Sequence, residues 1–159
     1  MERMFNTFNL GNLKLLNRFV FPPIKIGAGN PDGAVTDQQL IFYRQIARSG
    51  PAIVIIEPVS VTANGREHPK QPFVHLPQSA SELRKIVDVI HEENRLACLH
   101  LNHAGAGALP KIIGGQPKAP SVMTCVARNG TVSEALSEQD IEMILEGYKS
   151  SAQKAQEAG

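Results

Sequence analysis

Apolar residues along the chain fall into short runs typical of buried strands and into longer stretches with helical spacing. Three short runs predict strands, at Phe19–Phe21, Ile53–Ile56 and Leu96–Leu101. Each run is followed by a segment rich in glycine or proline and then by an amphipathic pattern with the period of a helix. Strands that alternate with helices indicate a parallel sheet with right-handed crossovers. The pattern therefore predicts three consecutive strand–helix units.

Capping residues predict where the helices of these units begin. Thr36 is followed three residues later by Gln39, and Ser137 by Asp140, so each pair can form a capping box. A serine at position 79 or 81 is expected to cap the helix between them. The helices are expected over residues 37–49, from 79 or 81 to about 94, and 138–158.

The remaining segments predict a hairpin and two irregular stretches. Phe8–Leu10 and Leu13–Leu15 flank a Gly-Asn turn, which favours a small antiparallel hairpin ahead of the first strand. The second strand is expected to end at Glu57-Pro58, because proline lacks the N–H that a ladder needs. A long loop, 59–77, would follow, and loops of this length are usually functional or disordered. Residues 111–131 are expected to be irregular.

The glycine- and proline-rich segments all follow the carboxyl ends of the predicted strands. Pro22-Pro23 ends the first strand abruptly, and Gly27 and Gly29 then allow the backbone to approach a ligand closely. The connections from helix to strand are short, so a site is expected on one face, as in an eight-fold barrel. A whole barrel needs about 250 residues, whereas this sequence has 159 residues and three predicted strand–helix units. The fold class is therefore predicted to be α/β, a partial (β/α)8 barrel made of the hairpin and the first three βα units.

Charge and cysteine content exclude several classes of protein. The net charge of +1 argues against an electrostatic nucleic-acid or membrane surface. No apolar run approaches the roughly 20 residues of a membrane span, and the N-terminus lacks the apolar core of a signal peptide, so a cytoplasmic location is expected. Cys98 and Cys125 form no disulfide framework, and Cys98 is expected to be buried. Five histidines without ligand-like spacing predict no metal site.

Two polar groups have competing interpretations. His103, in a His-Ala-Gly sequence, is expected to hold a loop in place rather than to act in catalysis. Arg66 and Lys70, in the long loop, are expected to lie on a solvated face, with contact to a substrate or to a cofactor phosphate as the alternative. The segment Gly105-Ala106-Gly107 is a weak phosphate-loop signal, because no helix is predicted to open directly after it.

Several motifs, in this order and at this spacing, resemble the old yellow enzyme family of FMN-dependent NAD(P)H oxidoreductases and ene-reductases. The resemblance covers residues 1–159, which would be the N-terminal portion of an FMN-binding barrel domain and the first three-eighths of that barrel. The matching segments are Asn17-Arg18-Phe19-Val20 with Pro23, Ile55-Ile56-Glu57 with Gly65-Arg66, Leu101-Asn102-His103-Ala104-Gly105, Ala119-Pro120-Ser121, and the helix after Ser137.

The resemblance implies a set of cofactor-binding residues. In the family, the backbone after the first strand contacts the flavin, and the position after the glutamate of the second strand lies beside the flavin ring. A glutamine that ends the third strand usually hydrogen-bonds the pyrimidine ring of the flavin, and a histidine replaces it here. That histidine can offer one hydrogen bond from each ring nitrogen. The implied residues are Pro22, Pro23, Ile24, Lys25, Pro58 and His100.

The resemblance also implies a function. A hydride would pass from NADH or NADPH through the flavin to an activated alkene or another small-molecule acceptor. The catalytic residues of the family would lie beyond Gly159, so none is assigned here. The rest of the barrel would come from a companion chain, or a homo-oligomer would cover the open edge. The alternative is a non-catalytic half-barrel module that self-associates or binds a partner chain without flavin.

Overall fold

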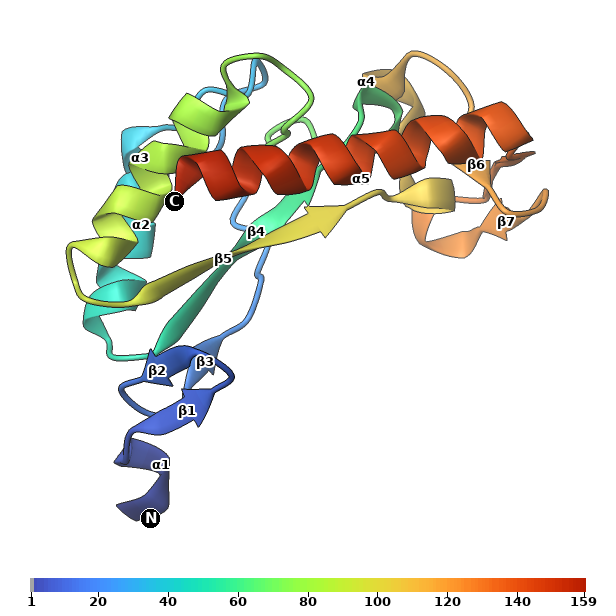
Figure 1. Ribbon diagram of the computed structural model, residues 1–159. Coiled ribbons are helices and arrows are strands. Elements are labelled where there is room, and N and C mark those ends of the chain that lie inside the picture. Colours follow the sequence, from blue (N-terminus) through green and yellow to red (C-terminus); the bar gives the residue numbers. More distant parts are fainter. Residues whose placement is uncertain (1) are drawn as a thin grey trace.

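The computed structural model describes residues 2–159, and Figure 1 shows the arrangement of their helices and strands. In chain order the elements are α1 (Glu2–Phe5), β1 (Phe8–Leu10), β2 (Leu13–Leu15), β3 (Val20–Phe21), α2 (Asp37–Arg48), β4 (Ile53–Ser60), η1 (Ala63–Gly65), α3 (Ser79–His91), β5 (Leu96–Asn102), η2 (Gly105–Gly107), α4 (Pro110–Ile113), β6 (Lys118–Ala119), β7 (Thr124–Cys125), η3 (Val126–Arg128), β8 (Thr131–Val132), β9 (Glu134–Ala135) and α5 (Glu138–Ala158).

A three-stranded parallel sheet in the order β3-β4-β5 forms the centre of the fold. Val20 is the partner of Ile53 across the first pair of strands, and Ile53 is the partner of Leu96 across the second. Helices α2 and α3 pack against each other, and α5 packs on α3 and β5, along one side of the sheet (Figure 1). The predicted parallel strands, their adjacency and their sequence order are confirmed.

Strand β4 continues past the point where the sequence predicts its end. Its pairing with β5 shifts in register between Ile56 and Val59 and then resumes, with Val59 opposite Leu101. Pro58 cannot donate to the ladder, yet its carbonyl oxygen accepts a hydrogen bond from Gln71 Nε2 at 3.2 Å. The expectation that the strand ends at Glu57-Pro58 is wrong, because the strand passes the proline through an irregularity rather than stopping there.

The hydrophobic core lies between the sheet and the helices. Tyr43 of α2, Ile56 of β4 and Ile86 of α3 are fully buried in it, and Leu99 of β5 packs against it. Cys98 is exposed, so the expectation that it is buried is wrong. Successive side chains on a strand point to opposite faces, and the β5 side chains that pack against the core are Ala97, Leu99 and Leu101.

Two of the three helices start as predicted. Thr36 and Ser137 each form a complete capping box, with Gln39 and Asp140 respectively. The Lys118 ammonium, 2.7 Å from Asp140, and the hydrogen bonds from Ser137 hold the pKa of the Asp140 carboxyl well below its usual range. The predicted serine cap of α3 is wrong. Position 78 is the N-cap and its side chain makes no capping hydrogen bond.

The terminal and irregular segments are ordered by small sheets. Strands β1 and β2 form the predicted antiparallel hairpin. The segment expected to be irregular contains the short strands β6 and β7, which pair with β9 and β8 respectively. These pairs lie near the beginning of α5, and the N-terminal hairpin lies beyond the opposite end of the sheet (Figure 1). Among the helices in residues 2–159, none is long and apolar enough to cross a membrane.

Candidate functional site

A cleft of about 430 Å³ lies where the segment after β3 meets the end of β4 and the loop that follows it. This is the carboxyl-terminal side of the parallel sheet, where the sequence predicts a site. Backbone and side chains of both signs of charge contribute to its walls. The lining residues are Lys25, Ile26, Gly27, Glu57, Pro58, Glu67, His68 and Gln71.

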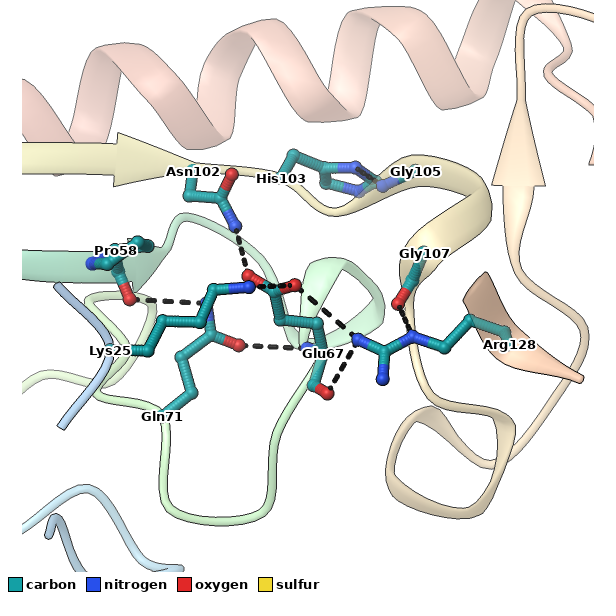
Figure 2. Close-up of polar contacts among 9 residues, drawn as sticks. All are labelled: Lys25, Pro58, Glu67, Gln71, Asn102, His103, Gly105, Gly107 and Arg128. Atoms are coloured by element: carbon teal, nitrogen blue, oxygen red, sulfur yellow. Dashed lines mark hydrogen bonds and ion pairs between the residues drawn. The ribbon is translucent and has the colours of Figure 1, made fainter. Parts of the chain in front are cut away.

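Glu67 is the central charged residue of this cleft. Its carboxylate accepts hydrogen bonds from Lys25 Nζ at 2.6 Å and from Asn102 Nδ2 at 3.3 Å. Arg128 Nη2 lies 3.5 Å from the same carboxylate and donates to the Glu67 carbonyl oxygen at 3.1 Å. Figure 2 shows these donors converging on Glu67 from three different segments of the chain. One carboxylate thus joins the segments that follow β3 and β4, the end of β5, and η3.

Gln71 and a further hydrogen bond of Arg128 fix the backbone around this cluster. Gln71 accepts a hydrogen bond from the Glu67 backbone N–H at 2.8 Å and donates to the Pro58 carbonyl oxygen (Figure 2). Arg128 Nε donates to the carbonyl oxygen of Gly107 at 2.7 Å. Specific hydrogen bonds therefore hold the long loop after β4, to Pro58 of β4 through Gln71 and to η3 through Arg128. The loop is ordered by these contacts.

A second carboxylate, that of Glu57, is almost completely buried, with 2% of the residue exposed. It accepts hydrogen bonds from the backbone N–H of Ile26 and from Gln39 Nε2, each at 3.2 Å. Its own backbone N–H donates to the Tyr43 hydroxyl at 2.8 Å. Burial raises the pKa of the Glu57 carboxyl, and the hydrogen bonds that it accepts oppose that shift. Burial raises the pKa of Tyr43 as well.

His103 packs against the backbone of η1. Its Nδ1 accepts a hydrogen bond from the Gly105 N–H at 3.1 Å, and a Cβ placed on Gly65 would lie 2.5 Å from its ring. Burial lowers the pKa of the imidazole. Because Nδ1 accepts, the proton of the neutral ring resides on Nε2. These contacts support the interpretation that His103 holds a loop in place.

The structure brings together only some of the residues that the resemblance implies. Lys25 and Pro58 line the cleft, whereas Pro22 lies along a second hollow, beside Phe19. Within residues 2–159, Pro23, Ile24 and His100 do not line the cleft. His100 is half-buried on β5, and its Nδ1 is buried without a hydrogen-bond partner among the described residues.

Arg66 differs from its expected place on a solvated face. Its guanidinium lies over the ring of Phe73, 4.4 Å from the centroid, and donates to the carbonyl oxygen of Pro69 at 2.9 Å. Burial lowers the pKa of this group. Arg66 thus stabilises the fold of the loop after β4, while Lys70 is exposed as expected.

Sequence reasoning missed Glu67, Gln71 and Arg128. Glu67 lies in a loop whose length favours a function, and this was the only available signal. Its partners lie 42 residues before it and 61 residues after it. No local pattern joins residues so far apart.

Comparison with known proteins places this geometry in a family. A model of the NADH:flavin oxidoreductase / NADH oxidase family matches residues 3–159. The chain is 28% identical to an NADPH dehydrogenase of Clostridium acetobutylicum over 99% of its own length and 45% of that protein. It is 29% identical to an NADH oxidase of Thermoanaerobacter brockii over 98% of its length and 24% of that protein. The chain thus spans less than half the length of these relatives.

Solved structures agree on the architecture. The old yellow enzyme homologue from Zymomonas mobilis superposes with a TM-score of 0.89 at 22% identity, over 98% of this chain and 46% of that one. Morphinone reductase in complex with tetrahydroNAD gives a TM-score of 0.87 at 25% identity, over 98% of this chain and 47% of that one. The predicted partial (β/α)8 barrel is confirmed. The chain belongs to the NADH:flavin oxidoreductase / NADH oxidase family, whose cofactor is FMN and whose reductant is NADH or NADPH.

Proposed function

We propose that residues 1–159 form the N-terminal portion of an FMN-dependent NAD(P)H oxidoreductase and hold one side of the flavin at the carboxyl ends of β3, β4 and β5. The family match over residues 3–159 is the observation that carries this proposal. The cleft beside Lys25 and Pro58 lies on that side of the sheet.

The residues present fit the cofactor in one testable respect. His100 Nδ1 is a buried polar atom without a partner in residues 2–159, and an unpaired buried polar atom costs free energy. A hydrogen bond to the pyrimidine ring of FMN would satisfy the imidazole. The backbone of Pro22, Pro23 and Ile24 and the side chains of Lys25 and Pro58 would complete this side of the site.

In this proposal the cofactor supplies the hydride chemistry, and the residues of this chain hold the cofactor. FMN, when bound, supplies hydride acceptance from NADH or NADPH and hydride donation to an activated alkene or another small-molecule acceptor. The residues of this chain bind and orient the cofactor. Lys25 offers a cation, which Glu67 holds at 2.6 Å. We assign the catalytic residues to the part of the barrel that follows Gly159, and a cytoplasmic location remains a prediction.

FMN titration followed by flavin absorbance and fluorescence tests the proposal, with the chain alone and with a polypeptide that supplies the later strands. Replacing His100 with alanine is expected to weaken FMN binding about 2- to 10-fold, because one net hydrogen bond is lost. The matched control is His91→Ala, an exposed histidine at the end of α3, which should leave the affinity unchanged. An absence of flavin binding in both samples, or equal affinities of all variants, would contradict the assignment.

The open barrel predicts association of the chain. Large apolar side chains of the N-terminal segment and of α5 are exposed, among them Phe5 at 65% and Leu145 at 63%, and β5 pairs on one side only. We infer that a companion chain carrying the later strands, or a second copy, covers these surfaces. A non-catalytic module that binds such a partner without flavin is the alternative, and the same exposed surfaces favour it.

Light scattering at micromolar concentration checks this inference. We expect an oligomer of the chain alone and a defined complex when the later strands are supplied. A stable monomer that unfolds cooperatively would contradict it. A complex that forms but binds no FMN would favour the non-catalytic alternative.

A further inference from the structure

Glu57 is a buried carboxylate without a cationic partner in residues 2–159. None of the ion pairs of the described chain includes it, and the groups that donate to its side chain are a backbone amide and a glutamine amide. Burial of a charge that is paired only with neutral donors costs free energy. Stability therefore explains the presence of this buried carboxylate poorly, and the contacts of its two oxygens point to another role.

The carboxylate of Glu57 holds the backbone that follows β3. It accepts from the N–H of Ile26 at 3.2 Å, and the adjacent amide of Gly27 also favours its charged form. Gly27 has a φ of 62°, in the left-handed region that favours glycine. The backbone turns at Gly27, and Glu57 holds the amide of Ile26, directly before that turn.

The other oxygen of Glu57 connects this turn to α2. It accepts from Gln39 Nε2, while Gln39 Oε1 accepts from the N–H of Thr36, the N-cap of the helix. The Thr36 hydroxyl donates to the carbonyl oxygen of Ala28 at 2.8 Å. The segment 26–28 is therefore held at one end by Glu57 and at the other by the cap of α2.

Lys25 immediately precedes this fixed segment. Its side chain is more than half exposed, and its amine contacts the Glu67 carboxylate at 2.6 Å in the cleft. An exposed lysine has many rotamers, so its mean position depends on where its backbone is held. In this chain of contacts, Glu57 sets the backbone and Glu67 receives the amine.

We propose that Glu57 is the positioning residue of the cleft, because its carboxylate fixes the amide of Ile26 and so directs the Lys25 amine toward Glu67. Glu57 acts through the backbone and need not touch a ligand. This role does not depend on which cofactor the cleft accepts.

The charge state of Glu57 gives this role a distinctive signature. The titratable groups around it are Tyr43 of α2, Lys25 after β3, and Glu67 and His68 after β4. Because its pKa is raised in the folded state, the native chain binds more protons than the unfolded chain above the ordinary glutamate pKa. Stability is therefore lost as the pH rises from that ordinary value through the raised one. A neutral replacement removes this loss at neutral pH.

The variant Glu57→Gln tests the proposal in the full chain. It keeps the shape of the side chain but places an NH2 group where an acceptor is needed. We expect amide exchange at Ile26 to become about tenfold faster, because a hydrogen bond to a charged acceptor is lost. Acylation of Lys25, followed by mass spectrometry, should become several-fold faster. The melting temperature should change by less than about 3 °C, since loss of the buried charge offsets loss of the hydrogen bonds.

Tyr43→Phe is the matched control. It removes the acceptor of the Glu57 backbone N–H and leaves the carboxylate and its partners in place. This variant should lose stability while Lys25 acylation and exchange at Ile26 stay as in the original protein. Equal loosening of the segment by both variants, or no loosening by Glu57→Gln, would overturn the proposal.

The original protein provides a second test that needs no variant to fold. In a pH titration by NMR, the amide shift of Ile26 should titrate together with the Glu57 carboxyl carbon, at a shared pKa above the usual range for glutamate. An Ile26 amide shift that stays constant while the Glu57 carboxyl titrates would show that the carboxylate does not hold this backbone.

Discussion

Replacing Ile86 with alanine is expected to lower the free energy of unfolding by about 2–5 kcal/mol. Ile86 lies in α3 with no exposed surface, within the cluster formed by α2, α3 and β4. The substitution removes three buried carbons and leaves a cavity that close-packed neighbours fill only partly. Urea unfolding followed by circular dichroism measures this loss of free energy. The sample is the oligomer or complex that the chain forms in solution.

The control for this prediction is Ile41→Ala. Ile41 belongs to α2 but is 55% exposed, so its removal should change the free energy of unfolding by no more than about 0.5 kcal/mol. The chemical change is the same in the two variants, and only burial differs. Equal losses would mean that the helix faces are assigned wrongly.

The second large effect is expected from Gly65→Ala, in η1 beside the cleft. A Cβ on Gly65 would lie 2.5 Å from Cδ2 of His103, and its neighbours leave no room for it. The ring or the loop must shift, which endangers the hydrogen bond from the Ala104 N–H to the Gly65 carbonyl oxygen. Overpacking of this kind costs about 1–3 kcal/mol. Urea unfolding measures that loss, and FMN titration should show weakened binding.

Gly107→Ala is the matched control for that substitution. Gly107 ends η2 near the same cleft, and a Cβ there would meet nothing within 4 Å. Neither glycine has a left-handed φ, so the two variants differ in contact and not in backbone strain. The Gly107 variant should keep both stability and binding. A loss that matches that of Gly65→Ala would refute the steric explanation.

Patterns local to a few residues made most of the fold predictable. Ile53–Ile56 is a β-branched run, which favours a strand, and the capping boxes at Thr36 and Ser137 mark helix starts through contacts between residues three apart in the sequence. The parallel order followed from the alternation of strands and helices. Serine at 79 or 81 was the exception, because α3 begins without a side-chain cap.

The site was less predictable because its contacts are long-range. The family resemblance singled out Lys25 and Pro58, and both line the cleft. The hydrogen bonds of Glu67 to Asn102 and Arg128 join segments that only the folded chain brings together. The burial of Glu57 likewise depends on α2 packing over β4. No periodicity or capping rule predicts contacts between residues so far apart in the sequence.

The register shift at Pro58 also bears on how this sequence can vary. A one-residue slip along a strand turns every side chain to the other face, so a rigid ladder would transmit any insertion into the core. The irregularity between Ile56 and Val59 separates the base of β4 from the part that leads into the long loop. Insertions and deletions beyond Pro58 can therefore be absorbed there, and the cleft can diversify in evolution while the core side of the sheet keeps its alignment.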